Sequence, residues 1–281
     1  MATTEQTPRK TYFYRHSIVV RVTHWINVLC MTVLLMSGLQ IFNAHPALYI
    51  GEKSNFDAPV LSMGAGRQPD GTLVGVTQIL GTNFDTTGVL GLSKADGDRL
   101  SVRGFPSWST IPGYQDLATG RRWHFFFAWL FVINGLVYIG YSIATGHWRQ
   151  LVPTVAQLRH TGSAIREHLM LRFPKGEEAK TYNVLQKLAY FGVVVVVIPV
   201  LILAGLTMSP GMDAAFPWLL DIFGGRQTAR TIHFIAATLL VLFVLVHMVM
   251  VLLSGVFNNM RSMITGRYRI EDDLEKPHAA E

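Results

Sequence analysis

The chain has 281 residues, of which 50 % are hydrophobic and only 15 % are charged. Soluble domains carry about 25 % charged residues, so this composition excludes a disordered protein and argues against a soluble enzyme. The single cysteine, Cys30, excludes a disulfide framework and any cysteine-rich zinc or iron–sulfur site. The net charge of +6 does not indicate a nucleic-acid partner, because the basic residues are spread along the chain instead of forming one patch.

The apolar residues gather in four runs, which we predict to be transmembrane helices. The runs cover about residues 17–42, 122–145, 185–208 and 229–257. Each is longer than the roughly 20 residues that cross the hydrocarbon core of a bilayer. The third run contains five successive valines, Val193 to Val197, but its length favours a helix over a strand. Pro199 is expected to kink this helix.

The basic residues near the ends of these runs predict how the chain crosses the membrane. The N-terminal tail, the link at about residues 146–184 and the tail after the fourth helix all carry several Lys or Arg residues. Such segments face the cytoplasm in multi-pass proteins. We therefore expect an all-α, integral membrane four-helix bundle with both termini cytoplasmic, forming a single domain over residues 1–281.

The link between the first and second helices, about residues 43–121, is the one long segment outside the membrane. It contains Phe105-Pro106-Ser107-Trp108 and Ile111-Pro112-Gly113-Tyr114. Connections of this length without regular structure are usually functional or disordered. The aromatic residues favour an ordered periplasmic insertion, and a mobile one is the alternative.

Four of the ten histidines lie within the predicted spans: His24 in the first, His124 in the second, and His233 and His247 in the fourth. An ionisable side chain inside a membrane costs free energy and is a functional hypothesis by default. A hydrogen bond to a neighbouring helix would explain any one of these histidines. Their common arrangement needs a further explanation.

The four histidines fall into two pairs at matched depth. His233 and His247 lie on one face of the fourth helix, about 40° apart around its axis and about 21 Å apart along it. From the direction of each helix, His124 is level with His233 near the periplasmic side, and we call these two the outer pair. His24 is level with His247, and these two form the inner pair.

Two facing neutral imidazoles are the axial ligands of a six-coordinate b-type haem, and such cofactors lie in the cores of helix bundles. Zinc fits less well, since only two ligands meet at each level. Arg21, Arg121 and Arg230 each precede one of these histidines by three residues, on the same helix face and nearer the water. They are candidates to neutralise haem propionates. Arginines that simply extend to the membrane surface are the alternative.

Two glycines also lie in similar settings near the outer ends of their helices. Gly38 ends the segment Leu35-Met36-Ser37-Gly38 of the first helix, and Gly205 lies in the third helix. Small residues here would let a flat macrocycle or another helix approach closely. The sequence leaves both explanations open.

With these residues the chain resembles the bacterial di-haem cytochrome b membrane subunits, a cytochrome b561-like family. That family includes the cytochrome b of nickel–iron hydrogenases, the gamma subunit of formate dehydrogenases and the cytochrome b of thiosulfate reductase-like systems. The resemblance covers all four spans. It implies two haems b, one held by His24 and His247 and the other by His124 and His233. It also implies a multi-pass protein of the bacterial cytoplasmic membrane.

The resemblance further implies a quinone site and a partner protein. The segment Tyr182-Asn183-x-x-Gln186 is similar to one that lines a quinone pocket in the formate dehydrogenase relatives, which implies that Asn183 and Gln186 contact ubiquinone or menaquinone. Helix capping by Asn183, with a solvated Gln186, is the alternative. The long periplasmic link is closest to the thiosulfate reductase-like branch. That branch implies a periplasmic redox partner, a molybdopterin oxidoreductase.

These expectations describe a di-haem subunit that passes electrons between the quinone pool and a periplasmic redox protein. The alternative is a stand-alone superoxide oxidase that passes electrons from superoxide to ubiquinone. It would need an open basic funnel formed by Arg121, Arg122, Arg226 and Arg230, which the long link could cover. A transporter with a histidine relay is a third possibility, disfavoured because the spans contain few polar residues besides Asn27 and Asn134.

Overall fold

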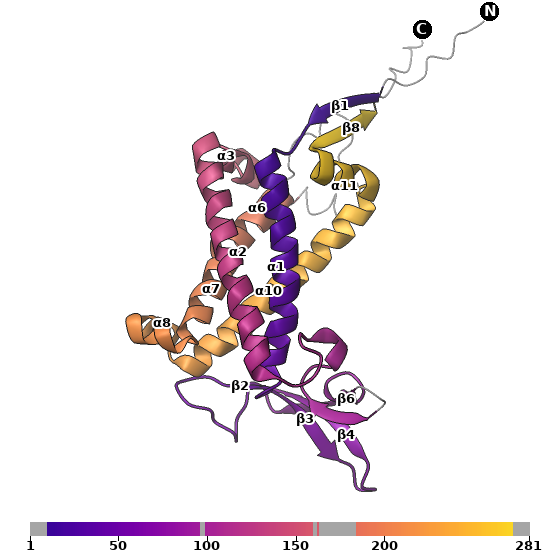
Figure 1. The fold of residues 1–281 in the computed structure, drawn as a ribbon, viewed down its shortest axis with the longest axis vertical. Helices are drawn as coiled ribbons and strands as arrows, with labels where there is room; N and C mark the ends of the chain where they lie inside the picture. Colours follow the sequence, from indigo (N-terminus) through magenta and orange to yellow (C-terminus); the bar gives the residue numbers. More distant parts are fainter. Residues whose placement is uncertain (1–9, 96–98, 160–161, 163–183, 272–281) are drawn as a thin grey trace, which may run out of the picture. The chain divides into compact units, whose positions relative to one another are not determined.

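The computed structural model describes residues 10–95, 99–159, 162 and 184–271 (Figure 1). Four helices are long and apolar enough to cross a membrane: α1 (Ile18–Phe42), α2 (Leu117–Thr145), the helix from Val184 to Thr207, and α10 (Arg226–Leu253). The four predicted spans are confirmed, with α2 beginning at Leu117 and not at about residue 122. Large apolar side chains such as Phe126 and Ile143, each 65 % exposed, lie on their surfaces. Lipid is the solvent that such surfaces require.

The third span is not a regular α-helix throughout. It consists of α6 (Val184–Gly192), a π-helical stretch over Val193–Val197, and α7 (Ile198–Thr207). Proline has no backbone N–H, so Pro199 cannot complete an α-helical hydrogen bond to the preceding turn. The irregularity expected at Pro199 takes the form of this wide turn through the five valines.

The fourth span ends earlier than predicted. Instead of continuing to residue 257, α10 ends at Leu253, and a separate helix, α11 (Val256–Thr265), begins after Gly255. Gly255 has a φ angle of 101°, which is incompatible with a continuous α-helix. The prediction was wrong here because the apolar residues Val256 and Phe257 continue the hydrophobic run past this break.

The insertion between α1 and α2 is built from strands, so the all-α prediction is wrong for this part of the chain. One antiparallel sheet has the order β2 (Ala47–Leu48), β3 (Leu61–Arg67), β4 (Leu73–Ile79), β5 (Thr82–Asp85), and a second pairs β6 (Gly91–Lys94) with β7 (Leu100–Arg103). Glycine permits their close approach. A Cβ atom on Gly75 would lie 2.4 Å from the Leu90 carbonyl oxygen, and one on Gly91 would lie 2.3 Å from that of Gly64.

The chain divides into two compact units, and each membrane span contributes residues to both. The first unit comprises Met1–Trp25, Val137–Val194 and Leu242–Glu281, and the second comprises Ile26–Leu136 and Val195–Val241. In the first unit, β1 (Lys10–Tyr14) pairs antiparallel with β8 (Arg267–Glu271) beside α11 (Figure 1). The same unit contains the short helices α3 (Trp148–Leu151) and α4 (Val155–Arg159).

In the second unit, the helices pack through an apolar core. Cys30 and Val33 of α1 are buried against Phe127 and Phe131 of α2, with partly buried residues of α7 around them. The Asn134 side-chain amide donates a hydrogen bond of 2.7 Å to the Asn27 side-chain oxygen, which joins α2 to α1. The second unit also contains two short helices, α8 (Pro210–Ala215) and α9 (Trp218–Phe223), and the short 3-10 helix Ser107–Ser109.

The insertion is attached to the membrane helices of the second unit by buried contacts, and its strands lie beyond the end of α1 (Figure 1). Phe42, Leu48 and Met63 form a second buried cluster. The Arg103 side chain is 3 % exposed. Its guanidinium group donates hydrogen bonds to four neutral oxygen atoms, which belong to the Phe105 and Gly113 carbonyls and to the Gln40 and Thr110 side chains. Because Gln40 belongs to α1, this network ties the insertion to the end of that helix.

His16, which precedes α1 in the first unit, predicts how stability depends on pH. Burial, together with the smaller effect of the neighbouring charges of Arg15, His147, His24 and Arg21, lowers the pKa of His16 from 6.5 to about 4. Between these pH values the unfolded chain binds a proton that the folded chain excludes, so stability falls as pH falls from about 6.5 towards 4. We expect the melting temperature of His16→Gln to fall less steeply over this range. If the melting temperatures of the two proteins fell equally steeply with pH over this range, this assignment would be contradicted.

Candidate functional site

The outer pair comes together in the second unit. The imidazole centroids of His124, on α2, and His233, on α10, lie 6.3 Å apart, and the ring planes are 67° apart. Both side chains are half-buried. The two histidines that the sequence placed at one depth therefore face each other in the structure.

His124 is oriented by Ser37 of α1. The fully buried Ser37 hydroxyl lies 2.6 Å from the Val33 carbonyl oxygen, to which it donates its one hydrogen. The Ser37 oxygen is also 3.1 Å from Nδ1 of His124. With its hydrogen committed to Val33, Ser37 accepts the hydrogen of Nδ1. The neutral imidazole then carries its free lone pair on Nε2.

His233 is oriented in the same sense by the backbone of α7. Its Nδ1 lies 2.8 Å from the Leu201 carbonyl oxygen. A carbonyl can only accept, so Nδ1 carries the hydrogen and Nε2 carries the lone pair. Histidines that bind metals generally donate their other ring N–H in this way. Both members of the outer pair are thus prepared to bind a metal through Nε2.

The two glycines noted in the sequence make room for these rings. A Cβ atom on Gly38 would lie 3.3 Å from Cε1 of His124, and one on Gly205 would lie 3.1 Å from both Cε1 and Nδ1 of His233. The glycines therefore let α1 and α7 approach the imidazoles of the outer pair.

Gly205→Ala should disturb the outer pair. The new methyl group would be closer to His233 than ordinary van der Waals contact allows, so the ring must shift or weaken its hydrogen bond to Leu201. We expect a reduced haem signal per protein in the reduced-minus-oxidised spectrum, and a smaller loss for Gly38→Ala. Gly140→Ala on α2 is the control, because a Cβ atom there meets nothing within 4 Å. Equal spectra for Gly205→Ala and Gly140→Ala would contradict this role of Gly205.

The inner pair comes together in the first unit. The centroids of His24, on α1, and His247, on α10, lie 6.5 Å apart, with 58° between the ring planes. The His247 ring stacks on the Phe243 ring, with 6.1 Å between their centroids. Nδ1 of His24 is buried and has no hydrogen-bond partner among the residues that the structure describes. The inner pair therefore has the facing geometry of the outer pair, but His24 lacks the hydrogen bond found at His124 and His233.

Both pairs have a separation that fits one metal ion between two imidazoles. Metal–nitrogen bonds of about 2.0 Å and a ring radius of about 1.2 Å put the centroids of two opposed imidazole ligands about 6.4 Å apart. The observed separations are 6.3 Å and 6.5 Å. In the described part of the chain, no group of three or more His, Cys, Asp or Glu side chains could hold a metal ion. Two ligands fit a haem iron, whose other four ligands come from the macrocycle, and do not complete a zinc site.

The three arginines predicted to contact propionates each have a different neighbour in the structure. The Arg21 guanidinium donates to the Ile264 carbonyl oxygen of α11. Arg121 is exposed and lies 5.5 Å from the Phe125 ring centroid. Arg230 is half-buried and donates to the His45 carbonyl oxygen at 2.5 Å. Their contact with haem propionates remains a prediction.

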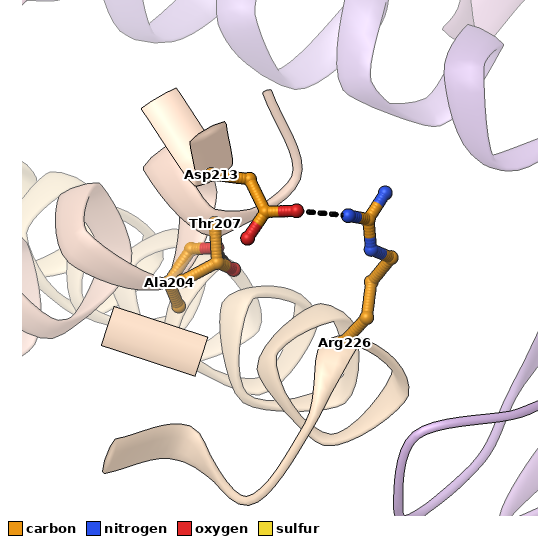
Figure 2. A network of polar contacts seen from close by, with 4 residues as sticks. All are labelled: Ala204, Thr207, Asp213 and Arg226. Carbon is orange, nitrogen blue, oxygen red and sulfur yellow. Dashed lines mark hydrogen bonds and ion pairs between the residues drawn. The ribbon is translucent and has the colours of Figure 1, made fainter. Parts of the chain in front are cut away.

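One arginine of the funnel expected for superoxide chemistry has a carboxylate partner. Arg226, in the first turn of α10, forms an ion pair with Asp213 of α8 (Figure 2). Figure 2 also shows Thr207 of α7, whose hydroxyl donates to the Ala204 carbonyl oxygen at 2.7 Å. Arg121 and Arg122 are exposed. The four arginines are therefore not equivalent, and the charge of Arg226 is compensated locally.

The residues predicted to contact a quinone are only partly placed. Asn183 lies outside the described residues, and Gln186 is half-buried in α6. The next residue, Lys187, is buried and donates to the Gln157 side-chain oxygen of α4 at 3.3 Å. The predicted quinone contacts remain untested.

Sequence reasoning missed the groups that orient the outer pair. Ser37 was noted only as the neighbour of Gly38, although a hydroxyl within a membrane span is itself a signal. The Leu201 carbonyl has no sequence signal, because every residue has a backbone carbonyl group.

Comparison with known proteins gives a family and a relative. Residues 15–266, which include all four spans and all four histidines, match the family described as prokaryotic cytochrome b561. The chain is 28 % identical over 245 residues to a protein of Azospira oryzae named "Putative protein-methionine-sulfoxide reductase subunit YedZ1". That alignment covers 87 % of this chain and 93 % of the relative. No solved structure gives a significant match.

Proposed function

Because the chain belongs to the prokaryotic cytochrome b561 family, a family of integral membrane proteins that carry haem b, we propose that it is a di-haem electron-transfer subunit. It would pass electrons between the quinone pool and a redox protein on the periplasmic side. The observation that carries this proposal is the presence of two facing histidine pairs, each at the separation expected for two axial ligands of one metal ion.

In this proposal the four histidines are the axial ligands. His124 and His233 would hold one haem through Nε2, and their Nδ1–H groups would keep donating to the Ser37 hydroxyl oxygen and the Leu201 carbonyl oxygen. His24 and His247 hold the other. Each haem b, when bound, supplies an iron centre that accepts and releases one electron. The protein supplies ligation, orientation and an apolar surrounding.

On the cytoplasmic side we propose that Asn183 and Gln186 bind ubiquinone or menaquinone. A side-chain amide can donate a hydrogen bond to a quinone carbonyl group, which has no hydrogen of its own to donate. The half-buried position of Gln186 at the start of α6 is compatible with this role.

On the periplasmic side we propose a redox partner that docks near the folded insertion. The name of the Azospira relative suggests a partner that reduces methionine sulfoxide in proteins. We further propose that this partner carries a molybdopterin cofactor, as the family resemblance implies.

The stand-alone superoxide oxidase is less well supported. An anion funnel needs uncompensated positive charge at its mouth. Arg226 is paired with Asp213, and Arg230 is half-buried with its guanidinium on a backbone carbonyl. These contacts argue against an open anion funnel that includes Arg226 and Arg230.

The proposal is tested by adding quinol anaerobically to the purified, oxidised chain and following haem reduction by absorbance. We expect reduction by ubiquinol or menaquinol, and slower reduction in Gln186→Leu. Gln115→Leu, in the exposed part of the insertion, is the matched control and should behave as the wild type. No haem reduction by either quinol would overturn the proposed function. Quinone reduction driven by superoxide, with no partner present, would favour the alternative.

A further inference from the structure

We infer that Ser37 is a positioning residue that lowers the reduction potential of the outer haem through its hydrogen bond with His124. This inference rests on the proposed function, since it requires His124 to be an axial ligand. One buried hydroxyl group would then influence the reduction potential of one of the two haems and not that of the other.

The first step is the direction of the hydrogen bonds at Ser37. The hydroxyl has one hydrogen, and the Val33 carbonyl oxygen is its nearest acceptor at 2.6 Å, with the Leu34 carbonyl oxygen at 3.3 Å. Nδ1 of His124, at 3.1 Å, is therefore the donor to the Ser37 oxygen, and the backbone carbonyl of Leu34 is a second acceptor beside the same ring. The carbonyl polarises the hydroxyl and makes its oxygen a better acceptor, because hydrogen bonds in a chain strengthen one another.

The second step is the effect on the ligand. An imidazole whose Nδ1–H is held by an acceptor is more basic at Nε2, and such partners tune the metal that Nε2 binds. A more basic ligand stabilises ferric iron over ferrous iron. The Ser37 hydroxyl is fully buried, so water does not replace it as the acceptor.

The third step is a comparison of the ligands. His233 has the same kind of hydrogen bond, but its acceptor is the backbone of Leu201, which no side-chain substitution removes. Nδ1 of His24 has no partner in the described part of the chain. A substitution at Ser37 should thus change the reduction potential of the outer haem and leave that of the inner haem unchanged.

The experiment is a redox titration of the purified full chain, followed by the absorbance of the two haems. We expect Ser37→Ala to retain both haems and to shift one midpoint potential upward. The shifted potential should be the one that disappears in His124→Ala. Ser37→Thr keeps a hydroxyl group and should restore the wild-type potential.

Thr207→Val is the matched control. The Thr207 hydroxyl is 1 % exposed and donates to the carbonyl three residues earlier, so its removal deletes the same kind of buried helix hydroxyl. We expect both potentials to stay unchanged. If Ser37→Ala loses a haem, Ser37→Cys takes its place, because a thiol is a weaker acceptor, and the same upward shift is required.

The outcomes separate this inference from the proposed function. Two bound haems with unchanged potentials in Ser37→Ala would overturn the role of Ser37 and leave the function intact. Retention of both haems with normal potentials in His124→Ala would overturn the ligand assignment itself.

Discussion

Replacing His24 and His247 together with alanine should leave one haem b per chain, whereas replacing His124 and His247 together should leave none. Each haem needs two axial histidines, so a second substitution within one pair removes nothing further, and one substitution in each pair removes both. The facing geometry of the two pairs is the basis for this expectation. The measurement is the ratio of haem to protein in the purified variants, by the pyridine haemochrome method.

His147→Ala is the control for this experiment. His147 lies after the end of α2, and its ring centroid is 6.4 Å from that of Tyr138. It belongs to neither histidine pair, so the variant should retain two haems. One haem in the variant with both His124 and His247 replaced would show that the histidines are paired differently.

Arg103→Met should loosen the insertion and lower the free energy of unfolding by roughly 3 kcal/mol or more. The substitution leaves several buried oxygen atoms without a donor, and each such atom costs about 1–3 kcal/mol. These atoms include the side-chain oxygens of Gln40 and Thr110. The measurements are the melting temperature of the detergent-solubilised protein and the rate of proteolysis within the insertion.

Arg67→Met provides the comparison for Arg103. Arg67 is also in the insertion, but it is exposed and its guanidinium donates to the Gly71 carbonyl across a hairpin. Its loss should change stability by less than about 0.5 kcal/mol. Similar melting temperatures and proteolysis rates for the two variants would contradict the anchoring role of Arg103.

The membrane spans were predictable because lipid leaves an apolar segment of this length one way to satisfy its backbone groups, which is a helix. The end of α10 was not predictable from hydropathy. The residues after Gly255 are still apolar, and the break depends on the backbone conformation of that glycine.

The strands of the insertion were not predicted, because four of the six have only two to four residues and because the positions of all six depend on contacts between strands. Gly75 and Gly91 lie where backbone atoms of other segments come too close for any side chain. Such contacts have no local sequence signal, unlike the alternation of polar and apolar residues in a longer strand.

The histidine pairs were predictable because a helix fixes both the depth and the face of each residue. The fine contacts were not. The spacing of Arg230 and His233 places the two on one face, but it does not say that the long arginine side chain reaches the His45 carbonyl. The contact between Ser37 and His124 likewise depends on the packing of α1 against α2.

The most direct test of the account is the haem content of the purified wild-type chain, measured together with its reduced-minus-oxidised spectrum. Two facing histidine pairs predict two haems b per chain, both reducible by dithionite. One haem per chain would mean that one of the two pairs does not bind, and none would contradict the assignment of all four histidines.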